Sequence, residues 1–157
     1  MPDDLYERDI LIWAEQQSAL LRRVANGERV NMVDWPHVIE EIADLGNSEL
    51  NAVRSLLLQA ILHLFKLAAS PDDLAREHWL TEIDAFLGSA QQRFTPSMRQ
   101  RIDLDAVYAN ARTRTLRRYR DLSLPTQCPW SLDALLEGDL DSLLTTLADS
   151  PSQPNPA

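Results

Sequence analysis

The stretch LLLQAILHLF, residues 56–65, decides the fold of this chain. It lies within a longer segment, residues 49–69, whose apolar side chains recur at helical spacing nearly all round the helix axis. A helix that is apolar on almost every side is normally buried by its neighbours. The run is too short and too polar to span a bilayer, which takes about 20 apolar residues. We therefore predict that it forms the central, most buried helix of the fold.

Helical patterns continue on both sides of this central segment. The first predicted helix covers residues 3–25. Asp34 is then the predicted N-cap of a second helix that runs toward Gly46. Gly46 either ends that helix before a new N-cap or kinks one long helix. Later patterns predict helices over 74–92, over 95–119 with a second cap at Asp103, and two short ones opened by Ser131 and Asp141. No segment alternates with the period of two that is typical of a strand.

The fold class follows from this order of elements. Because every strong pattern is helical, we predict an all-α fold: an antiparallel helical bundle with short C-terminal helices packed around it. A length of 157 residues suits a single domain, which we assign to residues 1–149. The last segment, SPSQPNPA over residues 150–157, is polar and rich in proline, and we predict that it is disordered.

Cysteine content and the N-terminal sequence bear on location. Cys128 is the one cysteine of the chain, so no internal disulfide can form, as is usual in a reducing cytoplasm. The N-terminal MPDDLYERD is acidic and lacks the basic and apolar regions of a signal peptide. We expect a cytoplasmic protein that does not associate with membranes. The sequence places no base beside Cys128, and we interpret it as a buried structural thiol.

Charge is distributed unevenly along the chain. The net charge is −9, yet residues 93–120 carry eight arginines against two aspartates. Within this block Arg114, Arg117 and Arg118 share one helix face of the segment Arg112–Arg120. Such a face can bind phosphate groups or nucleic acid. Because the chain as a whole is acidic, we expect these arginines to pair with its own carboxylates instead.

The stretch DWPHVIEEIADLG, residues 34–46, brings His37, Glu40 and Glu41 within one turn of a predicted helix. Glu41 lies at the edge of the helix face that carries Val38, Ile42 and Leu45. Glu40 points to the other side, so the two glutamates do not act together. His37 lies four residues before Glu41 and would form a minor surface pair with it. A metal site would need at least a third ligand from elsewhere in the fold.

Polar residues on inward helix faces are the main candidates for a functional site. Asp9 falls within the apolar arc of the first helix, about one turn before Trp13. His63 and Glu49 share a stripe with apolar residues of the central helix. A buried carboxylate or imidazole needs a partner. We therefore predict a small polar pocket formed by Asp9, His63 and either Glu41 or Glu49.

Each of these features also has a simpler structural interpretation. A neutral His63 that is hydrogen-bonded to a carboxylate or carbonyl of a neighbouring helix is favoured over a ligand or general base. In one straight helix Glu41 and His63 would lie ~33 Å apart, so they share a site only if the chain turns back near Gly46. His78 and Glu82, four residues apart, are interpreted as a surface pair. The sequence has no glycine-rich phosphate loop, no cysteine pair and no nucleophile elbow, and no cofactor is evident.

This set of residues resembles the bacterial family called domain of unknown function 29, over roughly residues 5–140. The matching elements, in chain order, are Tyr6, Asp9 and Trp13; DW....EEI..LG.SE over 34–49; HL.K over 63–66; Trp79 with Ile83; Pro96-Ser97; Tyr108 with Ala111; and P..CPW over 125–130. The chain departs from the family pattern at Pro36 and at Phe65-Lys66-Leu67, which concern packing. The resemblance implies an all-helical fold and no established activity. It places five polar residues within the family's motif as those to test: Asp9, Glu40, Glu41, His63 and Lys66.

Three functions are compatible with these features. Because no catalytic motif is complete and the charges are segregated, we expect a protein that acts through contact with a protein partner or with its own second copy. The first alternative is an enzyme or metal-binding bundle that uses Asp9, Glu41 and His63. Candidate binding residues beside them are Trp13, Glu40, Glu49 and Lys66. The second alternative is nucleic-acid binding through Arg112–Arg120.

Overall fold

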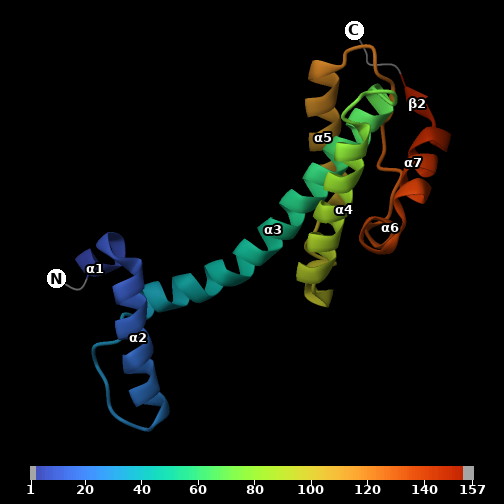
Figure 1. Cartoon of the computed structure of the whole chain (residues 1–157). Coiled ribbons are helices and arrows are strands. Elements are labelled where there is room, and N and C mark those ends of the chain that lie inside the picture. The colour runs from blue at the N-terminus through green and yellow to red at the C-terminus, as the bar shows by residue number, and fades with distance from the viewer. Residues whose placement is uncertain (1–2, 154–157) are drawn as a thin grey trace. The chain divides into compact units, whose positions relative to one another are not determined.

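The computed structural model describes residues 3–153 and is all-α, as predicted (Figure 1). Its helices are α1 (Asp3–Arg8), α2 (Ile10–Ala25), α3 (Trp35–Ala69), α4 (Arg76–Arg93), α5 (Leu104–Arg118), α6 (Leu132–Glu137) and α7 (Leu140–Asp149), with a 3₁₀ helix at Pro96–Met98. Two short strands, β1 (Leu124–Pro125) and β2 (Ser152–Gln153), pair antiparallel. Ser152 and Gln153 belong to the segment predicted to be disordered, whereas residues 154–157 of that segment lie outside the described residues.

The chain divides into two compact units, residues 1–48 and residues 49–157. The boundary falls between Ser48 and Glu49, within α3. Helix α3 is continuous through Gly46. This excludes the alternative in which one helix ends at Gly46 and a new one begins after it. The single domain predicted over residues 1–149 stays a prediction.

The prediction of one helix over residues 3–25 is wrong, because the chain breaks at Asp9. The Oδ1 atom of Asp9 accepts a hydrogen bond from the Ile12 backbone N–H at 3.1 Å, which makes Asp9 the N-cap of α2. A helical wheel drawn through both helices placed this carboxylate on the inward face. Its local bond to the first turn of α2 explains why it lies at a helix start instead.

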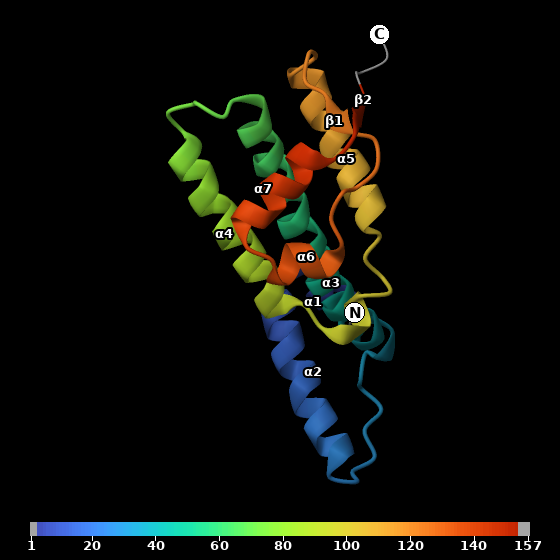
Figure 2. The same cartoon turned by 90° about the vertical axis from the view of Figure 1, so that its right-hand side faces the viewer.

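The second unit is built around the C-terminal part of α3, as predicted. Helix α4 runs antiparallel to α3, α5 lies on its other side, and α6 and α7 cover a further face (Figures 1 and 2). The residues of α3 that are fully buried here are Val53, Leu57, Ala60, Ile61, Leu64 and Phe65. Burial on this scale explains the apolar run at 56–65: each side of the helix meets a different neighbour.

Three aromatic rings lie at the centre of this core. Phe65 packs with its ring centroid 5.5 Å from that of Tyr108 and 6.3 Å from that of Trp130. The Tyr108 hydroxyl donates to the Pro125 carbonyl at 2.7 Å, and Trp130 Nε1 donates to the Leu143 carbonyl at 3.0 Å. These bonds satisfy the polar ends of two buried rings and attach the segment around β1, together with α7, to the core.

By length and composition α3 could cross a membrane, and it is the one such helix among residues 3–153. The central helix of a water-soluble protein passes the same test. Its residues from Val53 to Leu67 line the core of the second unit, and this burial favours the interpretation as a core helix.

Candidate functional site

A cluster of hydrogen-bonded and stacked side chains holds the first unit together. Asp34, which immediately precedes α3, accepts from Trp13 Nε1 at 3.1 Å and from His37 Nδ1 at 2.7 Å. The Tyr6 hydroxyl donates to Glu41 Oε1 at 2.6 Å. The Tyr6 and His37 rings stack with their centroids 3.9 Å apart. The cluster therefore links α1, α2 and the start of α3.

These contacts shift the protonation of two members of the cluster. The hydrogen bond from His37 lowers the pKa of Asp34, and the bond from Trp13 acts in the same direction. The hydrogen bond to Glu41 raises the pKa of Tyr6 to about 12, because loss of the phenolic proton would leave two negative oxygens in contact. The side chains of Asp34 and Glu41 are thus each held by hydrogen-bond donors from neighbouring segments.

Of the residues predicted for a polar pocket, Asp9 and Glu41 lie in the first unit, and His63 and Glu49 lie in the second. The described bond of Asp9 is to the start of α2, and Glu41 accepts from Tyr6. Glu49 pairs with Arg93, whose Nη1 lies 3.1 Å from its Oε1. Glu40 is exposed. Within residues 3–153 no group of three His, Cys, Asp or Glu side chains is placed to hold a metal ion.

Trp13 is a candidate binding residue from the sequence. Asp34 is predicted there only as a helix cap, and Tyr6 is not among the predicted site residues. A signal for them is present in the sequence. Asp34 precedes a tryptophan at a helix start, and Tyr6 lies seven residues before Trp13 in the pattern of the family resemblance. What the sequence alone cannot supply is the return of residues 26–33 alongside α2, which brings Asp34 to Trp13.

In the second unit His63 is buried, and both of its ring nitrogens have partners. Nδ1 lies 2.8 Å from the Gln59 carbonyl oxygen, and Nε2 lies 2.7 Å from Glu82 Oε2 on α4. His78 Nε2 lies 3.4 Å from the other oxygen of Glu82. The predicted His78–Glu82 pair is thus present, and Glu82 also reaches His63. Partners on its own backbone and on a neighbouring helix match the structural interpretation given to His63.

The expectation that the arginine face is neutralised by nearby carboxylates is wrong within the second unit. In the part of the chain that the structure describes, Arg114, Arg117 and Arg118 take part in no salt bridge. The acidic residue Asp133 pairs with Arg99 instead, at 2.7 Å. Pairing depends on which side of α5 faces the acidic α6, and sequence patterning does not determine that.

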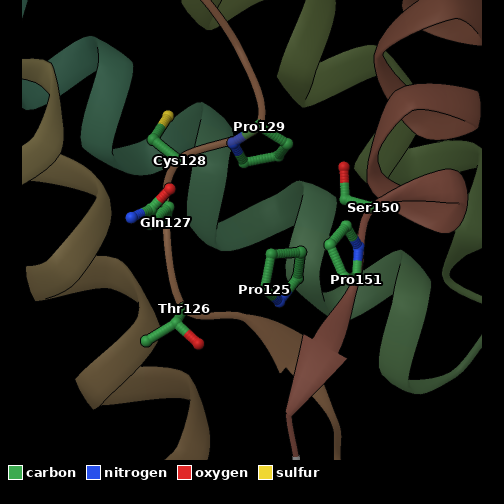
Figure 3. A pocket seen from close by; sticks show the side chains of 7 residues that line it. All are labelled: Pro125, Thr126, Gln127, Cys128, Pro129, Ser150 and Pro151. Atoms are coloured by element: carbon green, nitrogen blue, oxygen red, sulfur yellow. The ribbon is translucent and has the colours of Figure 1, made fainter.

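A cavity of about 510 Å³ lies between residues 125–129 and 150–151 (Figure 3). Its walls are mainly proline rings and small polar side chains, and Cys128 is its single titratable side chain. The Cys128 thiol donates to the Trp130 carbonyl at 3.3 Å, and burial raises its pKa. A thiol in this environment is a poor nucleophile at neutral pH, in keeping with a structural thiol.

The first unit exposes an unusual amount of apolar surface. Eight of the nine large hydrophobic residues exposed in the described structure belong to it: Ile10, Leu11, Ile12, Met32, Trp35, Ile39, Ile42 and Leu45. The four that lie on α3 (Trp35, Ile39, Ile42 and Leu45) fall within an arc of about 120° on the helical wheel. We call these four residues the apolar stripe.

Comparison with known proteins gives a family and a fold. The family model described as "Domain of unknown function DUF29" matches residues 5–140. Among solved structures, the chain is similar to an alpha-helical protein of unknown function from Rhodospirillum rubrum, at 26% sequence identity and a TM-score of 0.69. The match covers 93% of this chain and 98% of the other. No curated protein matches the chain.

Proposed function

The chain belongs to the domain of unknown function 29 family, and from the geometry of its first unit we propose that it acts through protein–protein contact. The observation that supports this proposal is the apolar stripe. Ile39, Ile42 and Leu45 are 62%, 67% and 68% exposed, respectively. Contiguous exposed apolar side chains on a protein in water usually mark an interaction surface.

The two sides of α3 within this unit differ in a way that supports the assignment. His37 and Glu41 face α1 and α2. Val38, which falls within the arc of the apolar stripe between Ile42 and Leu45, is only 7% exposed. On a helix that packs with one side only, the other side is normally polar. Here that other side carries Trp35, Ile39 and Ile42 of the apolar stripe, so it is suited to packing against a further helix.

We propose a second copy of the chain as the occupant. Trp35, Ile39 and Ile42 follow one another at spacings of four and three, which is the spacing of a seam between two paired helices. Glu40 and Asp44 lie on the opposite side of the helix from this seam. A twofold pairing of two stripes would therefore bring apolar side chains together without placing like charges in contact.

The other functions receive less support. A metal-binding or catalytic pocket would need Asp9 and Glu41 to be available, and each already accepts a described hydrogen bond. Nucleic-acid binding through Arg112–Arg120 is opposed by the net charge of −9. A cytoplasmic location stays part of the proposal, and it rests on the single cysteine, which excludes an internal disulfide.

Sedimentation equilibrium on the full chain tests this proposal. We expect a reversible dimer, and we expect Ile42→Ser to weaken it by about tenfold or more, because a buried isoleucine contributes about 1.5–3 kcal/mol. Residues 1–48 carry ten acidic and four basic side chains, so added salt should strengthen the dimer by screening their repulsion. Leu74→Ser is the matched control, since Leu74 is fully exposed in the second unit.

A chain that stays monomeric at all accessible concentrations would contradict pairing with a second copy. Equal weakening by Leu74→Ser and Ile42→Ser would show that association does not use the stripe.

A further inference from the structure

A cavity of about 260 Å³ lies between α3 and the last turns of α5, inside the second unit. Helix α3 contributes Gln59, His63 and Lys66 to its wall. Helix α5 contributes Arg114 and Arg118, and Tyr119 follows directly after that helix. We call this the basic cavity. It brings together residues that are up to 60 positions apart in the sequence.

The charge of the basic cavity is entirely of one sign. Lys66, Arg114 and Arg118 are cations, and no carboxylate is among the residues that line the cavity. None of the three takes part in a salt bridge within the described residues, whereas Arg93 and Arg99 in the same unit do. Three cations around a small volume repel one another, and the arrangement is stabilised when an anion occupies the space between them.

Aromatic contacts hold two of these cations in place without cancelling their charge. Lys66 Nζ lies 6.0 Å from the centroid of the Trp79 ring, and the guanidinium carbon of Arg118 lies 5.7 Å from that of Tyr119. Cation–π contacts orient a charged group and leave its N–H donors available to a ligand.

Helix dipoles explain only part of this charge. Lys66 and Arg118 lie in the last turns of α3 and α5, where cations compensate the carbonyl ends. Each helix end amounts to roughly half a negative charge. Two ends therefore offset about one of the three cations and leave about two positive charges over.

His63 lies in the wall of the basic cavity, and both of its ring nitrogens already have partners. Its Nδ1 faces the Gln59 carbonyl and its Nε2 faces a carboxylate oxygen of Glu82. Glu82 is bound to His63 and His78 and does not line the cavity, so it does not fill the space with negative charge.

We propose that the basic cavity is a binding site for a phosphate group, either as free phosphate or as part of a small phosphorylated molecule. Two guanidinium groups can each offer a pair of N–H donors to phosphate oxygens, and an ammonium group adds a point charge. The volume lies just below the usual range for ligand pockets, about 300–1,000 Å³. This size suits a small ligand and not a nucleotide chain.

Isothermal titration calorimetry on the full chain tests the site with inorganic phosphate, phenyl phosphate and a single-stranded DNA oligomer as probes. Chloride at the same ionic strength serves as the reference. We expect saturable phosphate binding with a Kd near or below about 1 mM. Lys66→Gln, and the double variant Arg114→Gln with Arg118→Gln, should each weaken it by about tenfold or more, the order expected when a charge-assisted contact is lost.

Arg117→Gln is the matched control, because Arg117 lies on the same helix and does not line the basic cavity. It should change phosphate binding by less than about twofold. Circular dichroism should show that every variant keeps the helical content of the parent. Tighter binding of phenyl phosphate than of inorganic phosphate would assign the site to phosphate monoesters, and the reverse order would assign it to the free ion.

Three results would overturn the proposal. The first is the absence of saturable phosphate binding, and the second is an equal loss in Arg117→Gln, which would indicate general attraction to the arginine face. The third is much tighter binding of DNA with a steep salt dependence, which would favour a nucleic-acid surface. Because the apolar stripe lies in the other unit, its variant Ile42→Ser should leave phosphate binding unchanged.

Discussion

The two units of this chain are held together by different chemistry. The second contains a continuous core of 22 buried hydrophobic residues. Among the described side chains of the first unit, the buried hydrophobic residues are Trp13 and Val38. Its helices are instead joined by hydrogen bonds from Tyr6 to Glu41 and from Trp13 and His37 to Asp34.

This difference indicates where the molecule is labile. A unit that buries little apolar surface gains little to offset the entropy of ordering its chain. Each hydrogen bond adds a net amount of only about 0.5–1.5 kcal/mol. The first unit should therefore be the less stable of the two, and its stability should depend on the charge of its carboxylates and on whatever covers the apolar stripe.

The largest expected effect lies in the core of the second unit. Phe65→Ala should lower the free energy of unfolding by about 3–5 kcal/mol, because it empties the space between Tyr108 and Trp130. Hydrogen exchange resolved by mass spectrometry should show lost protection over residues 50–147 and little change over residues 10–25. Phe65→Leu, which keeps most of the volume, should cost less than Phe65→Ala. Equal loss in both ranges would break the comparison and show that the chain unfolds as one body.

A smaller effect is expected from acid in the first unit. The pKa of Asp34 is lowered in the folded chain, so its carboxylate binds a proton less tightly than in the unfolded chain. The stabilisation it gives is present above the unfolded pKa of about 3.9 and is lost as the pH falls through the folded pKa. The protection factors of the α2 amides, which correct for the intrinsic pH dependence of exchange, should therefore fall below about pH 4.

Asp34→Asn sharpens this prediction. It should cost the first unit about 1–3 kcal/mol at neutral pH, since hydrogen bonds to a charged group are lost, and it should remove much of the acid sensitivity. Glu40→Gln, at an exposed position, is the control and should change neither. An acid response that survives in Asp34→Asn would assign it to other carboxylates.

The smallest effect concerns Cys128 in the second unit. Burial raises the pKa of its thiol, and each unit of increase lowers the thiolate fraction at neutral pH by about tenfold. We expect a disulfide reagent to react with Cys128 more slowly in the native chain than in the chain unfolded by urea. Rapid reaction under native conditions would show that the structure around residues 125–130 opens easily, contrary to the burial that raises the pKa of the Cys128 thiol.

Much of the fold could be predicted from the sequence because its strongest signals are local. The run at 56–65 is apolar on nearly every side, and the caps at Asp103, Ser131 and Asp139 are short-range features. Asp103 and Ser131 are the caps that the sequence predicts, whereas the predicted cap Asp141 lies two residues after the observed one. The helix break at Asp9 was not predicted, because its position in the sequence is compatible both with the inward face of one long helix and with the N-cap of a new one. The division at residue 48 escaped because helical periodicity continues across Gly46.

The candidate sites depend on contacts between segments that are distant in the sequence. Asp34 meets Trp13 only after the connection from α2 to α3 has turned back. Lys66 faces Arg118 only after α5 has packed beside α3. From the sequence, Lys66 and Arg118 are separate candidates, and helical periodicity alone does not place them in one cavity.

The position of the core helix in the chain also has a consequence during synthesis on the ribosome. The apolar residues of α3 are complete by Leu67, but the last residue that buries them, Leu147, follows about 80 residues later. At about 5–20 residues per second, this interval lasts roughly 4–16 s. For that time the nascent chain presents an unpaired apolar helix, which makes it a natural client for chaperones that bind emerging polypeptides.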